Sequence, residues 1–207
     1  MNTQVRVWCL RHAESENVTA ALAGALPNAP LTERGHEQSV RVARALAGEP
    51  IRAVYASATV RACETAEPLA AAHGLPVLGV PGLVEMGIGR EEGSGDPAVR
   101  ARTTEVLRSW VVDGDLDERV ADGETGHEVL DRTTAAFRRM AERHSGETVA
   151  VVGHVGSLTL VLSQLCGLGA SVWGAPLPHA EPFLVEWDGG RWGGVAGLTA
   201  GGSPLQW

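Results

Sequence analysis

The stretch that decides the fold of this chain is VRVWCLRHAESEN, residues 5–17. Its first six residues are mostly apolar, which is typical of a short buried strand. The run ends at an adjacent arginine and histidine, Arg11 and His12. In an open α/β sheet, ligands bind at the edge where the strands end. The guanidinium of Arg11 suits phosphate, and His12 can act as a base, an acid or a nucleophile near neutral pH.

Strand-like runs alternate with Ala-rich helical patterns along the chain. The strands are predicted at residues 5–10, 53–55, 76–80 and 148–152, with a two-stranded tail at 182–187 and 191–198, and the helices at 33–47, 60–73, 97–112, 126–144 and 157–165. Thr125 and Glu128 form a capping-box pattern at the start of the fourth helix. This alternation is typical of a mostly parallel sheet with helices on both faces. We therefore predict an α/β three-layer sandwich, with residues 1–207 as a single domain.

Residues 86–123 are the least regular part of the chain and are rich in Gly, Asp, Glu and Arg. Long irregular insertions often carry function. This segment is predicted as a small helical cap, or lid, inserted beside the site. The alternative is a solvated surface excursion that contains one helix.

Composition excludes several classes of protein. The net charge of −8 argues against a nucleic-acid or membrane partner, although a local cluster of Arg can still bind an anionic small molecule. All 17 basic residues are Arg, so lysine Schiff bases and Walker-type phosphate loops are excluded. The three cysteines are far apart and form no C-x-x-C pattern, and no run of about 18 apolar residues occurs. We expect a cytoplasmic protein.

Three later segments supply further candidate groups for a site around His12: a second arginine, a second histidine and a carboxyl group. Arg61 falls in the first turn of a predicted helix, where free N–H groups favour an anion. His154 follows the apolar run 149–153 and, like His12, lies at the end of a strand. Glu85 follows another strand and precedes a Gly-rich turn, where a carboxyl group can act as an acid.

Together these residues fit phosphoryl transfer through histidine. A metal site is disfavoured because each histidine lies near an Arg or a helix start and because no H-E-x-x-H pattern occurs; no G-x-S-x-G serine motif occurs either. A neutral nitrogen of His12 would attack phosphorus. The oxygens would be held by Arg11, Arg61 and a protonated His154. Glu85 would protonate the leaving alcohol and then activate water.

The chain resembles the histidine phosphatase superfamily, the phosphoglycerate mutase-like fold, in its phosphatase branch. The matching segments, in family order, are Arg11-His12-Ala13-Glu14-Ser15, Leu31-Thr32-x-x-Gly35-x-x-Gln38, Ser57-x-x-x-Arg61-Ala62-x-x-Thr65-Ala66, Leu83-x-Glu85-x-x-x-Gly89-x-x-x-Gly93, Gly123-Glu124-Thr125 and Gly153-His154. The resemblance implies a phosphohistidine on His12, no metal or organic cofactor, and a sheet with an inserted helical cap.

Two positions depart from the family pattern. Ala13 replaces the usual Gly, and Ala would be strained there if a positive φ were required. The family often has a phosphate-binding Asn six residues after the nucleophile, whereas Asn17 comes five residues after His12. Asn17 remains a candidate phosphate ligand.

We predict a phosphomonoester hydrolase that acts on a small phosphorylated metabolite. One alternative is a phosphomutase, which needs a second set of cations; Arg90, Arg100 and Arg102 are the candidates. Another is a catalytically silent phosphate-binding module. The C-terminal strands are candidates for pairing across a homodimer. The sequence leaves the identity of the substrate open.

Overall fold

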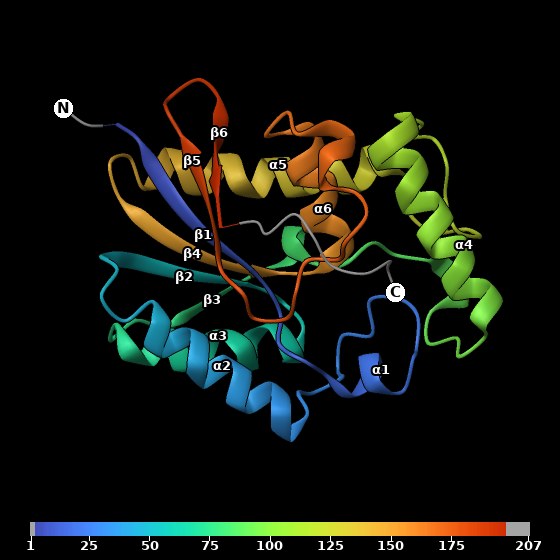
Figure 1. Cartoon of the computed structure of the whole chain (residues 1–207), viewed down its shortest axis with the longest axis horizontal. Helices are drawn as coiled ribbons and strands as arrows, with labels where there is room; N and C mark the ends of the chain where they lie inside the picture. Colours follow the sequence, from blue (N-terminus) through green and yellow to red (C-terminus); the bar gives the residue numbers. More distant parts are fainter. Residues whose placement is uncertain (1–2, 198–207) are drawn as a thin grey trace.

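A six-stranded sheet forms the centre of the computed structural model, which describes residues 3–197 (Figure 1). The strands are β1 (Val5–Arg11), β2 (Ile51–Ser57), β3 (Val77–Val80), β4 (Thr148–Gly153), β5 (Phe183–Trp187) and β6 (Trp192–Ala196), in the order β3-β2-β4-β1-β5-β6. The first four are parallel, and β5 and β6 add to β1 as an antiparallel pair. The predicted sheet is confirmed; residue 198, predicted at the end of the tail, lies outside the described residues.

The helices follow the predicted order. They are α1 (Glu16–Thr19), α2 (Glu33–Ala45), α3 (Val60–Ala72), α4 (Pro97–Arg108), α5 (Gly126–Arg143) and α6 (Val155–Gln164), and a π-helical turn over Ser109–Asp113 extends α4. Short 3-10 turns occur at Pro81–Leu83, Gly89–Glu91 and Gly169–Val172. The predicted capping box at the start of α5 is present. No helix within residues 3–197 is long and apolar enough to cross a membrane.

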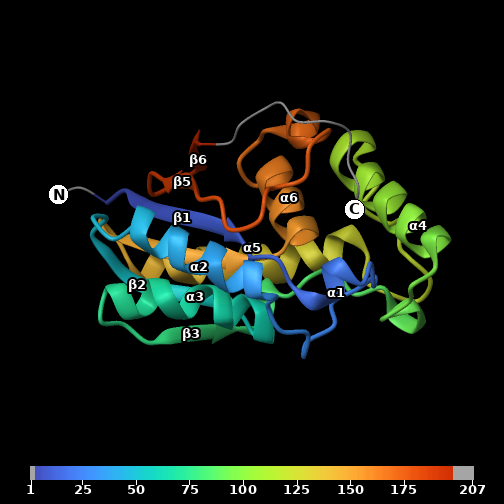
Figure 2. The same cartoon turned by 60° about the horizontal axis from the view of Figure 1, so that its bottom comes forward.

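Helices cover both faces of the sheet, as Figure 2 shows. Strand β4 explains why, because every one of its residues is buried and its side chains alternate between the two faces. Val149 and Val151 pack in a cluster with residues of α5 and α6. Ala150 and Val152 pack in a second cluster with residues of α2 and α3. The three-layer sandwich therefore follows from one short apolar run buried on both sides.

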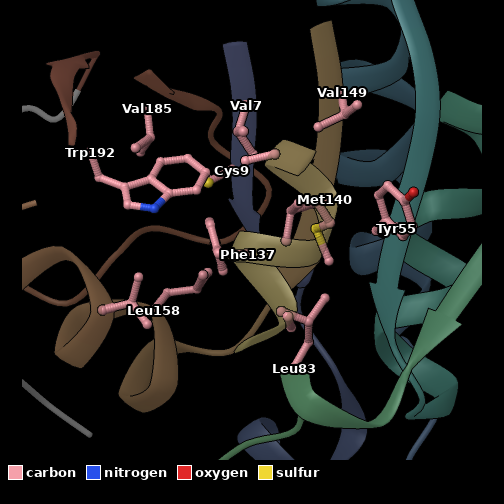
Figure 3. Close-up of a cluster of buried hydrophobic side chains, with 14 of the residues drawn as sticks. Val7, Cys9, Tyr55, Leu83, Phe137, Met140, Val149, Leu158, Val185 and Trp192 are labelled. Carbon is pink, nitrogen blue, oxygen red and sulfur yellow. The ribbon is translucent and has the colours of Figure 1, made fainter. Parts of the chain in front are cut away.

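The cluster on the α5 face is the larger of these two, and Figure 3 shows its side chains. Phe137 of α5 and Trp192 of β6 meet edge to face, with ring centroids 5.5 Å apart. Aromatic pairs prefer this geometry. The contact therefore packs the antiparallel edge of the sheet against the helix layer.

Residues 86–123 contribute a third apolar cluster. Trp110 is completely buried in it, and its indole N–H donates to the carbonyl of Glu118 at 2.9 Å. Leu107 of α4 and Leu160 of α6 belong to the same cluster, so this segment is packed on α6. In Figure 1, α4 stands beyond α6 at one end of the molecule.

Candidate active site

The two strand-end histidines face each other. His12 follows β1 and His154 follows β4, two adjacent parallel strands, and their ring centroids are 5.0 Å apart. Both side chains are buried. One cavity is lined by all six predicted site residues, namely Arg11, His12, Asn17, Arg61, Glu85 and His154. The tertiary structure thus brings the predicted set together.

His12 has the form of a nucleophile. Its Nδ1 lies 2.7 Å from the carbonyl oxygen of Ala13, which can only accept, so the proton is on Nδ1 and Nε2 keeps its lone pair. Burial lowers the pKa of His12 well below 6.5, and the nearby His154, Arg61 and Arg11 lower it further. His12 is therefore neutral at physiological pH.

Arg61 joins the two histidines and the loop after α1. Its Nε donates to Nε2 of His12 and its Nη2 to Nδ1 of His154, both at 3.2 Å. Its terminal nitrogens also donate to the carbonyls of Ala25 and Leu26, each at 2.7 Å. Because these carbonyls hold the guanidinium in place, Arg61 presents its charge beside Nε2 of His12.

His154 is held between Arg61 and Ser57. Its Nδ1 accepts from Arg61, and its Nε2 donates to the hydroxyl of Ser57 at 2.8 Å, which is the pattern of a neutral imidazole. Burial lowers the pKa of His154 well below 6.5, with smaller contributions from nearby arginines. A phosphate dianion in the cavity would raise that pKa, so the positive charge would arise only with ligand bound.

Arg11 has an unused donor inside the site. Its Nη1 donates to the carbonyl of Leu177 at 3.0 Å, while its buried Nε has no partner among the described residues. Burial lowers the pKa of Arg11 to about 10, so the side chain stays charged at neutral pH. A buried cation with a free N–H matches an anionic ligand. Across residues 3–197, no group of three or more His, Cys, Asp or Glu side chains is arranged to hold a metal.

Glu85 is held at the start of α6. Its two carboxylate oxygens accept from the backbone N–H groups of Met86, Gly156 and Ser157, each at 2.9 Å. The glycine at 156 leaves room for the carboxylate in this position, since a Cβ would lie 2.6 Å from it. These donors fix the carboxylate on the wall of the cavity that His12 lines.

The two departures from the family pattern cause no disruption. Ala13 is buried, is not among the residues with positive φ, and donates its N–H to Thr65 at 2.9 Å. Asn17 is buried and lines the cavity, and its Oδ1 accepts from the hydroxyl of Ser15 at 2.8 Å.

The second family motif, residues 31–38, supports the loop that carries His12. Thr32 donates to the Glu14 carboxylate at 2.9 Å, and Gln38 accepts from the Glu14 N–H at 2.8 Å. Gly35 allows α2 to approach closely, because a Cβ there would lie 2.0 Å from the Glu14 carbonyl. Through these contacts with Glu14, the motif supports the loop that carries His12.

Sequence reasoning missed the roles of three polar residues around the histidines. The hydroxyl of Ser57 accepts a hydrogen bond from Nε2 of His154 at 2.8 Å. Thr65 joins the Ala13 N–H to the Arg61 carbonyl. His179 donates from Nδ1 to the His12 carbonyl at 2.8 Å. A motif match could have singled out Ser57 and Thr65, but no local pattern marks His179.

Beyond the histidines, the cavity has mostly apolar walls. Helix α1 contributes Val18, and the segment after it contributes Leu22 and Ala23. The segment 86–123 contributes Met86, Ile88 and Leu107. Of the three candidate cations, only Arg100 lines the cavity. Arg90 pairs with Asp122 and Glu91, and Arg102 pairs with Glu118 and Glu105.

The chain belongs to the histidine phosphatase superfamily (branch 1), whose family model matches residues 7–196. It is 36% identical to an uncharacterized protein of Mycobacterium tuberculosis over 85% of each chain. It is 28% identical to the adenosylcobalamin/alpha-ribazole phosphatase of Escherichia coli, over 82% of this chain and 83% of that one. A solved structure, Bacillus stearothermophilus YhfR, superposes with a TM-score of 0.80 at 25% identity over 95% of this chain and 98% of that chain. A phosphoglycerate mutase from Bacillus anthracis has a TM-score of 0.82 at 18% identity over 95% of this chain and 93% of that one, which shows the fold.

Proposed function

We propose that this protein is a phosphomonoester hydrolase that acts on a small phosphorylated metabolite through a covalent phosphohistidine on His12. The observation that carries the proposal is the unprotonated Nε2 of a buried, neutral His12 beside the charged guanidinium of Arg61. A lone pair next to a fixed cation is what in-line attack on an anionic phosphorus centre requires.

In the first step, Nε2 of His12 gives up the hydrogen bond that it accepts from Nε of Arg61. Its lone pair then forms the P–N bond while the bond from phosphorus to the leaving oxygen breaks. Arg11, Arg61 and Asn17 bind the phosphoryl oxygens, and His154 takes up a proton as the dianion enters. Glu85, protonated at this stage, transfers its proton to the leaving oxygen, so the alcohol departs neutral.

In the second step, the Glu85 carboxylate takes a proton from a water molecule. The water oxygen bonds to phosphorus, and the P–N bond breaks and returns the electron pair to Nε2 of His12. Inorganic phosphate is released with His12 neutral again. The one carboxyl group serves as acid and then as base.

We propose residues 86–123 as the cap over this site. Met86, Ile88 and Leu107 line the cavity together with Val18 and Leu22. Walls of this kind favour a leaving alcohol with an apolar body, because burial of its apolar surface adds binding energy.

The arginine positions favour hydrolysis over the mutase alternative. A mutase must hold a second anionic group away from the transferred phosphate. Arg90 and Arg102 are both paired with carboxylates, and Arg100, which lines the cavity, already donates from Nη1 to the carbonyls of Ala21 and Gly95. The filled nucleophile, acid and arginine positions argue against a silent binding module.

The test is phosphate release from p-nitrophenyl phosphate by the wild type and by His12→Ala, with and without EDTA. We expect turnover by the wild type that EDTA does not change, and none by His12→Ala. Conversion of 3- to 2-phosphoglycerate without phosphate release would favour a mutase. Phosphate binding without turnover would favour the silent module.

A further inference from the structure

The guanidinium of Arg132, on α5, donates to the backbone carbonyls of one short segment, residues 82–85. Its Nη1 donates to the carbonyls of Gly82 and Val84, at 3.0 and 2.8 Å. One hydrogen of Nη2 goes to the carbonyl of Glu85 at 3.0 Å. A guanidinium has five N–H donors, and three of them are therefore spent on the backbone at and just before the candidate acid.

The remaining two donors go to Glu124. Nε and Nη2 of Arg132 donate to the two Glu124 oxygens at 2.7 and 2.9 Å, a two-point pair between largely buried side chains. One of those oxygens also accepts from the N–H of Gly87 at 2.7 Å. The Arg132–Glu124 pair thus holds the chain on both sides of Glu85.

The side chain of Glu85 and its backbone are held by different groups. The carboxylate is fixed by N–H groups at the start of α6, whereas the backbone carbonyl is fixed by Arg132 of α5. Neither the N–H groups of α6 nor Arg132 alone sets the distance between the Glu85 carboxyl group and a leaving oxygen bound above His12. Both are needed because the Glu side chain has three rotatable bonds between its backbone and its carboxylate.

We propose that Arg132, clamped by Glu124, is the positioning residue that fixes Glu85 for proton transfer. The inference rests on the proposed function and concerns the same site. Arg132 lies outside the residues that line the cavity, so it does not touch the substrate and acts through Glu85, apart from a small electrostatic effect that lowers the pKa of His154. Misplacement of a catalytic group by about 1 Å can cost about 100-fold in rate.

Two substrates with different leaving groups separate a positioning role from a purely structural one, since a structural defect would lower activity on both equally. An alkyl phosphate needs its leaving oxygen protonated, whereas p-nitrophenolate departs without a proton. Loss of Arg132 should therefore lower kcat/KM strongly for an alkyl phosphate and little for p-nitrophenyl phosphate. The kcat for p-nitrophenyl phosphate should fall, because hydrolysis of the phosphohistidine still needs Glu85 as a base.

The experiment compares Arg132→Met and Arg132→Lys with Arg139→Met, an exposed arginine on the same helix whose Nε donates to the Ala135 carbonyl. We expect Arg132→Met to lower kcat/KM for an alkyl phosphate by about 10- to 100-fold, and for p-nitrophenyl phosphate by less than about threefold. Arg132→Lys should recover part of the loss, since an ammonium can reach only some of the acceptors. Arg139→Met should match the wild type.

A second set of variants keeps the inference testable if Arg132→Met folds poorly. Glu85→Gln should show the same leaving-group dependence, and Glu85→Gln/Arg132→Lys should be no slower than Glu85→Gln alone. Equal losses on both substrates, or losses that multiply in the double variant, would overturn the role of Arg132. Activity in His12→Ala would instead overturn the proposed function, so the two failures are distinguishable.

Discussion

The stability of this protein should fall steeply in mild acid because three histidines of the site are held neutral. Burial is the main cause that lowers the pKa of His12 and His154 well below 6.5, and that of His179 to about 4. In the unfolded chain each would titrate near its ordinary value of about 6.5. Below that pH the unfolded state therefore binds about three more protons than the folded state.

The magnitude follows from this proton difference. The contribution of these groups is fully present above pH 6.5 and is lost as the pH falls toward the folded-state pKa values. Between about pH 7.5 and about pH 5.5, each histidine should cost about 1.4 kcal/mol, or about 4 kcal/mol together. This is a large share of the roughly 5–15 kcal/mol of a typical domain.

The assay is urea unfolding across this pH range, with the slope of the unfolding free energy against pH as the readout. The double variant His12→Gln/His154→Gln should reduce the slope from about three protons to about one, whatever its absolute stability. An unchanged slope in the double variant, or a wild-type loss below about 1 kcal/mol, would refute the assignment of neutral histidines.

Two further substitutions test the supports of the phosphate site. Gly35→Ala should lower both thermal stability and kcat/KM, since its Cβ would lie 2.0 Å from the Glu14 carbonyl; a melting temperature equal to the wild type would contradict this contact. Glu92 accepts from the Ala25 N–H at 2.7 Å, and Ala25 in turn accepts from Arg61. Glu92→Gln alone should therefore raise the Kd for vanadate about tenfold. Added to Arg61→Met, it should cause no further change in that Kd.

Much of the fold could be predicted from local patterns. The run 149–152 had to be a strand buried on both faces, and β4 is one. The capping box at Thr125 placed the start of α5 correctly. The start of α6 was predicted two residues late, at Ser157 rather than Val155, and the helix already includes Gly156. That glycine is inside the helix to make room for the Glu85 carboxylate, a contact across 71 positions of sequence.

The sequence by itself determined which residues meet at the candidate site, because strand ends and helix starts are marked locally and the ends of parallel strands meet at one edge of the sheet. Only the tertiary structure decided their states: the guanidinium of Arg61 beside Nε2 of His12, the neutral His154 bonded to Ser57, and the arginine of α5 that holds the Glu85 backbone. The physical reason is distance along the chain. Burial, donors and acceptors set a protonation state or an orientation, and here they come from positions 47 to 97 residues away, which no local pattern encodes.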